Sequence, residues 1–164
     1  CMQEKTEGTG RAALLAREFA GGRSFLLTFG DILVDAGDYR GIARRLDGDP
    51  DAEAVLGVKW VEDPWQGAAV YEQDGVVAKI VEKPPPGTSA THWNSAGLYA
   101  FRSSVFSELE RIPKSSRGEY ELTTAIEQML AAGRRLLSYP IRGAWRDVGR
   151  PEDLAAAEEI LGAP

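Results

Sequence analysis

Two aspartates in this sequence have the setting of metal-binding carboxylates. Asp31 follows an apolar run and a glycine, and Asp147 comes shortly before a helical segment near the end of the chain. Ligands of open α/β sheets gather at the carboxyl ends of strands. Two carboxylates that end an early and a late strand could therefore meet at one sheet edge and hold a magnesium ion through oxygen ligands. The alternative is a pair of ordinary turn aspartates.

The dipeptide Glu82-Lys83 is a second place where chemistry could occur. It ends the apolar run 76–81 and precedes three prolines. A carboxylate can accept hydrogen bonds from two sugar hydroxyls while an adjacent ammonium contacts a phosphate. The pair therefore suits a sugar phosphate, and its alternative interpretation is a solvated ion pair at a strand end.

The segment QEKTEGTG at 3–10 opens a helix and contains two glycines. Backbone N–H groups at a helix start are free to bind anions. This segment could therefore face a nucleotide base or phosphate, although an N-cap by Thr9 explains the pattern as well.

The order of elements that must position these residues predicts an α/β fold. Apolar periodicity predicts a helix from residue 9 to the glycines at 21 and 22, and further helices over 39–46, 104–109, 121–132 and 151–161. Short apolar runs predict strands over 24–29, 54–60, 68–71, 76–81, 97–101 and 136–141, with Asp74-Gly75 as a hairpin turn. Strands alternating with helices favour a Rossmann-like, mixed and mostly parallel sheet with helices on both faces. The continuously apolar run 24–29 is typical of a strand covered on both faces.

Composition excludes several classes of function. The 164 residues fit one ordinary domain or part of a larger one, and their net charge of -6 argues against a nucleic-acid partner, because a phosphate backbone needs a basic face. No apolar run approaches the roughly 20 residues of a membrane-spanning helix. One cysteine and one histidine can form neither an internal disulfide nor a zinc site. We therefore expect a cytoplasmic protein with no membrane contact.

Segments spread over nearly the whole chain resemble, in order, those of the sugar-1-phosphate nucleotidylyltransferases, the pyrophosphorylases that make nucleotide sugars. The matching segments are QEKTEGTGRA at 3–12, FLLTFGD at 25–31, DPWQG at 63–67, EKP at 82–84, NSAGLYAF at 94–101, GEYELTTA at 118–125 and WRDVGRPEDL at 145–154. Each is weak alone, and their shared order makes the resemblance specific.

The resemblance implies a role for each matching residue. It assigns base recognition to Gln3 and Gly8, magnesium to Asp31 and Asp147, sugar contacts to Gly67, Glu82, Asn94 and Gly97, and a phosphate contact to Lys83. Asp31, Asp147 and Lys83 would form the catalytic group. In this family an oxygen of a sugar 1-phosphate attacks the α-phosphorus of a nucleoside triphosphate (NTP), and pyrophosphate leaves. Such chemistry needs alignment and charge neutralisation more than an acid or a base.

The glycine-rich loop that opens the family's catalytic domain has no counterpart in these residues. The resemblance therefore implies that 1–164 is a single, partial nucleotidyltransferase catalytic domain, its carboxyl-side part, which lacks the first strands and is poorly active alone. A chain that begins with Cys1 agrees with this expectation. The open sheet edge and its apolar face would favour self-association or a homo-oligomer.

Two other functions also fit these residues. One is a non-catalytic sugar-phosphate binding or regulatory module. The other is a glycosyltransferase of related fold, which usually carries an Asp-x-Asp metal motif, whereas here Leu33 stands two residues after Asp31. The residues select neither the base nor the sugar, although Gln3 slightly favours uridine or thymidine.

Overall fold

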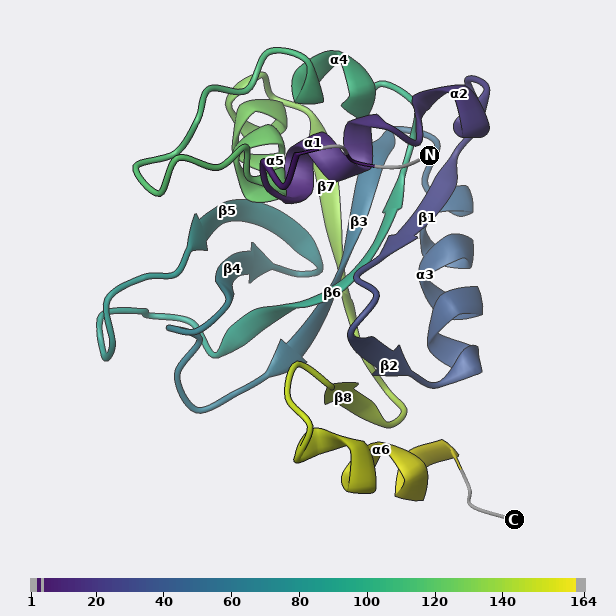
Figure 1. Cartoon of the computed structure of the whole chain (residues 1–164). Coiled ribbons are helices and arrows are strands. Elements are labelled where there is room, and N and C mark those ends of the chain that lie inside the picture. Colours follow the sequence, from purple (N-terminus) through teal and green to yellow (C-terminus); the bar gives the residue numbers. More distant parts are fainter. Residues whose placement is uncertain (1–2, 4, 162–164) are drawn as a thin grey trace.

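The computed structural model describes residues 3 and 5–161, which form a central sheet, helices on both of its faces and a small second sheet at one end (Figure 1). The strands are β1 (Phe25–Thr28), β2 (Ile32–Val34), β3 (Ala52–Trp60), β4 (Ala68–Gln73), β5 (Val76–Glu82), β6 (Trp93–Phe101), β7 (Arg135–Pro140) and β8 (Trp145–Asp147). The helices are α1 (Thr9–Leu14), α2 (Arg17–Ala20), α3 (Ala36–Asp47), α4 (Val105–Leu109), α5 (Leu122–Ala131) and α6 (Asp153–Leu161). The predicted mixed α/β class is confirmed.

The central sheet has the strand order β1-β6-β3-β7-β5-β4, with a further pairing between β4 and β6. Strands β1, β3, β4 and β7 run in one direction, and β5 and β6 run in the opposite one. The prediction of a mostly parallel sheet therefore holds for strand direction but needs correction for hydrogen-bonded neighbours. Among the described strands only β3 and β7 form a parallel ladder, because β6 lies between β1 and β3 and runs against both.

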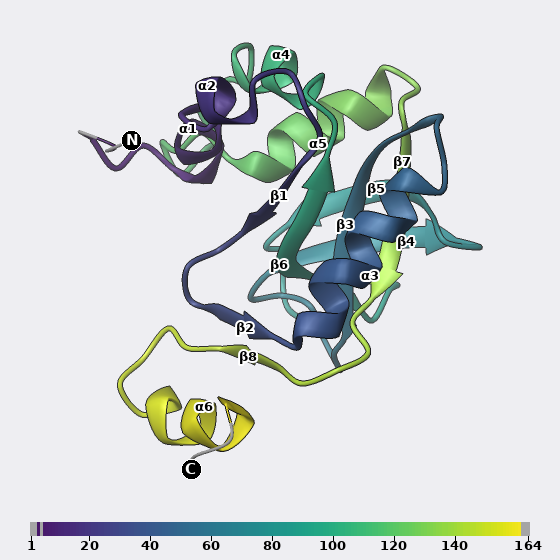
Figure 2. The same cartoon turned by 90° about the vertical axis from the view of Figure 1, so that its right-hand side faces the viewer.

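Helices cover the two faces of this sheet separately, as predicted. Helix α3 packs on one face, where its buried residues Ile42 and Leu46 are one helical turn apart and share a cluster with Leu137 of β7. Helices α1, α4 and α5 pack on the other face, where Phe101 and Met129 belong to a larger cluster. Figure 2 shows α3 alone on its side of the sheet.

Strand β1 differs from the prediction that it is covered on both faces. Phe25 and Leu27 are partly buried, whereas Leu26 and Thr28 are exposed. Within the described chain β1 pairs with β6 alone, so it forms an edge of the sheet. An edge strand with one covered face can carry a continuously apolar sequence, and the pattern alone does not distinguish it from a doubly covered strand.

Local backbone geometry explains two further outcomes. The predicted first helix is interrupted between α1 and α2 and ends at Gly21, which adopts a left-handed conformation with φ 55°. The hairpin predicted at Asp74-Gly75 is confirmed, since both residues have positive φ, 52° and 78°, as a type I′ turn requires.

Strands β2 and β8 form a two-stranded antiparallel sheet, in which Ile32 lies opposite Asp147 and Val34 opposite Trp145. Sequence periodicity did not predict β2, because three residues are too few to show an alternation. This small sheet joins the segment after β1 to the segment before α6. None of the helices in the described part of the chain is long and apolar enough to cross a membrane.

Candidate functional site

A cavity of about 540 Å³ opens where the ends of β4, β5 and β6 meet the start of α5 and strand β8. Its wall contains six of the residues singled out from the sequence, namely Gly67, Glu82, Lys83, Asn94, Gly97 and Asp147. These six residues come from four separate segments of the chain and meet around one space. A cavity of this size can enclose a small polar ligand such as a sugar phosphate.

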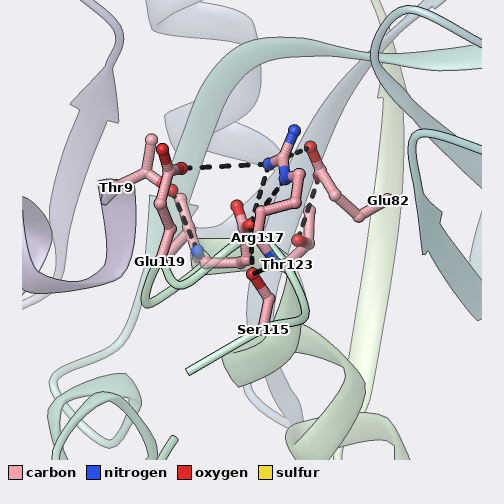
Figure 3. Close-up of polar contacts among 8 residues, drawn as sticks. Thr9, Glu82, Ser115, Arg117, Glu119 and Thr123 are labelled. Atoms are coloured by element: carbon pink, nitrogen blue, oxygen red, sulfur yellow. Dashed lines mark hydrogen bonds and ion pairs between the residues drawn. The ribbon is translucent and has the colours of Figure 1, made fainter. Parts of the chain in front are cut away.

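Glu82 is the last residue of β5, and its side chain is 27% exposed. The Thr123 hydroxyl donates a hydrogen bond of 3.0 Å to Glu82 Oε2, and Arg117 Nη2 approaches Oε1 at 3.4 Å (Figure 3). Burial raises the pKa of the Glu82 carboxyl, and nearby Glu121 raises it further, whereas Thr123, Arg117 and Lys83 act in the opposite direction. The carboxylate is therefore oriented by the protein while part of it remains accessible.

Arg117 lies among three carboxylates of the same wall (Figure 3). It donates to Glu121 from Nε at 3.1 Å and from Nη2 at 2.8 Å, and it forms longer ion pairs with Glu82 and Glu119. Glu121 also accepts a hydrogen bond of 2.9 Å from the Ser115 hydroxyl. Bonds to the nearly buried Glu121 hold the guanidinium in place, and Arg117 remains part of the cavity wall.

Lys83 follows Glu82 and adopts a left-handed backbone conformation with φ 43°. Its backbone N–H donates a hydrogen bond of 2.7 Å to the carbonyl oxygen of Gly67. This bond ties the end of β5 to the turn before β4, and the Lys83 ammonium has no ion-pair partner among the described residues. Lys83 and Arg117 thus supply two positive charges around the cavity.

Two glycines shape the floor of the cavity. A Cβ on Gly67 would collide with the Asn94 amide, and a Cβ on Gly97 would lie 2.8 Å from Ile32 Cγ1. Gly97 also has φ 71° and lies in a bulge of β6, where the register with β3 shifts between Leu56 and Val58. The Asn94 side chain donates 2.8 Å to the Ser95 carbonyl, and its Oδ1 has no partner in the described chain. Glycine at both positions therefore keeps the space open.

Asp31 and Asp147 are neighbours, although they are far apart in the sequence. The Val148 N–H donates 2.7 Å to the Asp31 carbonyl, and Asp147 lies opposite Ile32 in the β2–β8 ladder. Burial raises the pKa of the Asp147 carboxyl, and the negative charges of Asp31 and Asp153 add to this effect. Strand β2, which sequence analysis missed, pairs with β8 and so brings the two carboxylates together.

The paired aspartates suit a magnesium ion. Burial is the main cause of the raised Asp147 pKa, and a divalent cation would relieve the carboxylate repulsion that adds to it. No group of three or more His, Cys, Asp or Glu side chains with metal-binding geometry occurs in residues 3 and 5–161. Magnesium is usually held by only one or two protein carboxylates together with substrate phosphates and water, so this donor set fits.

Gln3 and Gly8, predicted for base recognition, do not line the cavity. Gly8 has φ 103°, and a Cβ there would lie 2.7 Å from the Tyr120 carbonyl oxygen, so its lack of a side chain serves packing. Gln3 Nε2 is buried without a hydrogen-bond partner in the described residues. Thr9, from the same segment, does line the cavity and accepts 3.0 Å from the Leu122 N–H.

Sequence analysis missed the polar wall contributed by the segment 115–123. Arg117 and Thr123 lie one residue before and five residues after Gly118, in and beside GEYELTTA, which was matched only as a helix start. Tyr99, whose hydroxyl meets the Ser95 hydroxyl at 2.7 Å, was also missed, and burial raises its pKa to about 12. The charge-rich run around Gly118 was the available signal.

A family model described as Nucleotidyl transferase matches residues 1–163 of this chain. The chain belongs to the nucleotidyl transferase family. This result confirms the resemblance to nucleotidylyltransferases that the ordered segments indicated.

Curated relatives of this nucleotidyl transferase chain include two proteins of Haloferax volcanii. The low-salt glycan biosynthesis nucleotidyltransferase Agl11 is 34% identical over 163 residues, which are 98% of this chain and 44% of that protein. The UTP–glucose-1-phosphate uridylyltransferase AglF is 30% identical over 97% of this chain and 65% of its own length. A bifunctional protein GlmU of Methanococcus maripaludis is 32% identical, and 36% of it is covered. The chain thus spans less than half of Agl11 and GlmU.

Solved structures agree with the nucleotidyl transferase assignment. A UTP-bound UGPase from Acinetobacter baumannii aligns with a TM-score of 0.80 and 25% identity, covering 96% of this chain and 57% of that one. A protein from Bacillus anthracis assigned as a glucose-1-phosphate thymidylyltransferase, in complex with a sucrose, gives 0.82 and 25% identity over 99% of this chain and 64% of that one. The predicted nucleotidyltransferase type of fold is therefore confirmed.

Proposed function

We propose that this chain belongs to an enzyme that transfers a nucleotidyl group from an NTP to a sugar 1-phosphate, giving a nucleotide sugar and pyrophosphate. The observation that carries the proposal is the arrangement of Glu82, Lys83 and Asp147 around one cavity, with Asp31 beside Asp147. A carboxylate can bind sugar hydroxyls, an ammonium can bind a phosphate, and a pair of carboxylates can bind a divalent cation.

The sugar end of the proposed site is the wall formed by β5, β6 and the turn before β4. Glu82 would accept hydrogen bonds from sugar hydroxyls, while Asn94 and the open space at Gly67 and Gly97 would accommodate the ring. Lys83 would meet the phosphate, since its ammonium is a compact positive charge next to the sugar-binding carboxylate.

The metal end is the aspartate pair. Asp31 and Asp147 would hold magnesium, which when bound neutralises charge on the transferring phosphoryl group. The protein would align the sugar phosphate oxygen with the α-phosphorus of the NTP, so that pyrophosphate leaves in line. Support for this division comes from the position of Asp31 beside Asp147: burial raises the Asp147 pKa, the charge of Asp31 adds to this effect, and carboxylates that repel one another are suited to a shared cation.

We further propose that residues 1–164 are a single, partial catalytic domain that is poorly active alone, in which the central sheet and the β2–β8 pair position the proposed sugar and metal residues. Gln3 and Gly8 are proposed to reach the base of the NTP from the segment that precedes α1. Self-association is proposed to occur through the edge of β1 that has no partner strand in residues 3 and 5–161. A cytoplasmic location stays a prediction.

The test is a pyrophosphate-release assay on the protein expressed from its complete gene. UTP, dTTP, GTP and ATP are each combined with glucose 1-phosphate, N-acetylglucosamine 1-phosphate and mannose 1-phosphate, with and without magnesium. We expect magnesium-dependent pyrophosphate release and an equal amount of nucleotide sugar for at least one pair. Asp147→Ala should abolish this turnover.

Two results would contradict the proposal. Binding of sugar phosphates without pyrophosphate release from any pair would favour the non-catalytic binding module. Transfer of the sugar from a supplied nucleotide sugar to an acceptor, with release of the nucleoside diphosphate, would favour a glycosyltransferase. Undiminished turnover in Asp147→Ala would remove the metal role from that residue.

A further inference from the structure

Thr123 makes a contact across the cavity wall that helix formation does not require. It lies in the first turn of α5 and is buried, with 6% of its surface exposed. Its hydroxyl donates 3.0 Å to Glu82 Oε2, and Glu82 belongs to a strand 41 positions earlier in the chain. The bond therefore connects two elements rather than stabilising one.

The start of α5 is capped by a different threonine. The Leu122 N–H donates 3.0 Å to the Thr9 hydroxyl, so a residue of α1 provides the hydroxyl oxygen that an N-cap side chain usually supplies. The N-cap residue of α5, Glu121, makes no side-chain capping bond and instead holds Arg117. Because Thr9 already accepts a hydrogen bond at the start of α5, the Thr123 hydroxyl is not needed there and can donate to Glu82.

The contacts of Glu82 leave part of its carboxylate available. Two oxygens offer about four acceptor positions, of which Thr123 uses one at 3.0 Å and Arg117 approaches a second at 3.4 Å. Both donors come from the segment 115–123, on one side of the carboxylate. The positions that remain are those a ligand in the cavity could use.

We propose that Thr123 is a positioning residue, which fixes the orientation of the Glu82 carboxylate so that its free acceptor positions face the sugar hydroxyls. This inference rests on the proposed function, since it concerns how the sugar phosphate is bound. Thr123 itself need not touch the substrate.

The pKa of Glu82 depends on the groups around it and provides a second way to test the inference. The groups that face Glu82 are Arg117 and Glu121 from the segment before α5, Lys83 next in the chain, and the Tyr99 hydroxyl of β6. Burial raises the Glu82 pKa, while the Thr123 bond lowers it. Loss of the hydroxyl should raise this pKa further, so that Glu82 accepts a proton at a higher pH.

The test compares three variants of the protein expressed from its complete gene. Thr123→Val removes the hydroxyl at nearly constant shape, Thr123→Ser keeps it, and Thr124→Val is the matched control one residue along, whose side chain makes no hydrogen bond in the described structure. Pyrophosphate release is measured with UTP and varied glucose 1-phosphate between pH 5 and 8, or with whichever NTP and sugar 1-phosphate in the panel above turn over.

We expect Thr123→Val to raise the KM for the sugar 1-phosphate about tenfold, as for loss of a hydrogen bond to a charged group, with a much smaller change in the KM for the NTP. The acidic limb of kcat/KM should move to higher pH in this variant. Thr123→Ser should restore both properties, and Thr124→Val should leave both unchanged.

The possible results distinguish a failure of the proposed function from a failure of the positioning role of Thr123. If the wild-type protein turns over no pair, the proposed function fails and the role of Thr123 fails with it. If the wild-type protein is active and Thr123→Val keeps its KM and pH profile, only the positioning role is overturned. Equal impairment of Thr123→Ser and Thr123→Val, or of Thr124→Val, would also overturn it, because the effect would then be structural.

Discussion

The Asp147 carboxylate lowers the stability of the fold, although the same carboxylate is the proposed ligand of magnesium. The Asp147 carboxyl has a pKa above the ordinary value of 3.8, first because of burial and then because of Asp31 and Asp153. The folded chain thus holds this proton more tightly than the unfolded chain does. The resulting loss of stability is absent at pH values below 3.8 and is fully present once the pH exceeds the raised pKa.

Asp147→Asn should therefore raise the melting temperature at pH 7 in metal-free buffer, and this gain should disappear near pH 3. Magnesium should stabilise the wild-type protein and have less effect on the variant. Differential scanning calorimetry at the two pH values, with and without magnesium, measures both effects. A variant less stable than the wild type at pH 7 without metal would contradict the destabilising burial and repulsion of the Asp147 carboxylate.

Glu82 gives a prediction about binding. Glu82→Gln keeps the size of the side chain but replaces one acceptor oxygen with a donor, so we expect the affinity for a sugar 1-phosphate to fall about tenfold or more. Because burial raises the Glu82 pKa, wild-type binding should weaken as the pH falls through that raised value, and the variant should keep only the dependence that comes from the phosphate of the ligand, which titrates at about pH 6. Isothermal titration calorimetry with glucose 1-phosphate from pH 4.5 to 7.5 checks both. An unchanged affinity in Glu82→Gln would remove Glu82 from the sugar site.

The individual site residues were predictable where a short motif isolates them. Glu82 and Lys83 stand out because charged residues end an apolar run and precede prolines. Arg117 and Thr123 were not predictable in the same way, because their shared partner Glu82 becomes a neighbour only when the segment 115–123 packs beside the end of β5. Contacts that depend on packing leave little trace in the local sequence.

At the scale of elements, the bulge in β6 is the feature on which the cavity depends. Gly97 has φ 71°, and a side chain there would meet Ile32 and Phe29. Gly97→Ala should therefore destabilise the protein by about 1–3 kcal/mol through backbone strain and crowding. It should also weaken sugar-phosphate binding, because the cavity floor would lose space.

Urea unfolding of Gly97→Ala measures the first effect, and glucose 1-phosphate titration measures the second. Gly133→Ala is a useful control, because Gly133 also has a positive φ of 71° but a Cβ there would meet nothing within 4 Å. It should lose stability from strain alone and keep its affinity. If Gly97→Ala binds as well as Gly133→Ala, Gly97 does not shape the sugar site.

The elements themselves were largely predictable from the sequence, with exceptions that have physical causes. The hairpin at Asp74-Gly75 was predictable because two adjacent residues with positive φ favour these residue types. The strand that ends at Asp147 was predicted and is β8, whereas its partner β2 was missed because three residues are too few to show an alternation. Four of the six strands of the central sheet point in one direction, as predicted. Neighbouring strands are nevertheless mostly antiparallel, because β6 lies between β1 and β3 and runs against both.

At the scale of the whole molecule, the described chain exposes apolar surface at and beside the edge strand β1. Leu26 on β1 is 43% exposed, and Phe19 on α2 is 80% exposed. An edge strand with exposed apolar side chains favours pairing with another copy. We therefore expect concentration-dependent self-association of the 164-residue chain in sedimentation velocity experiments.

Leu26→Lys should reduce this association, because a charge on an edge strand opposes pairing. Leu154→Lys is the matched control, since Leu154 is also exposed but lies in α6, away from β1. A wild-type chain that stays monomeric at all concentrations would contradict the prediction. Equal loss of association in both variants would show that β1 is not the contact.

The central claim is that a metal held by Asp31 and Asp147 and a sugar phosphate held by Glu82 and Lys83 share one cavity. The most direct test is the phosphorus-31 relaxation of UDP-glucose, or of the nucleotide sugar that the pyrophosphate assay yields, bound to the protein with manganese in place of magnesium. The account predicts strongly enhanced relaxation of both phosphorus nuclei in the wild-type protein and its loss in Asp147→Asn. Tight binding of the nucleotide sugar with the same relaxation in both proteins would contradict it.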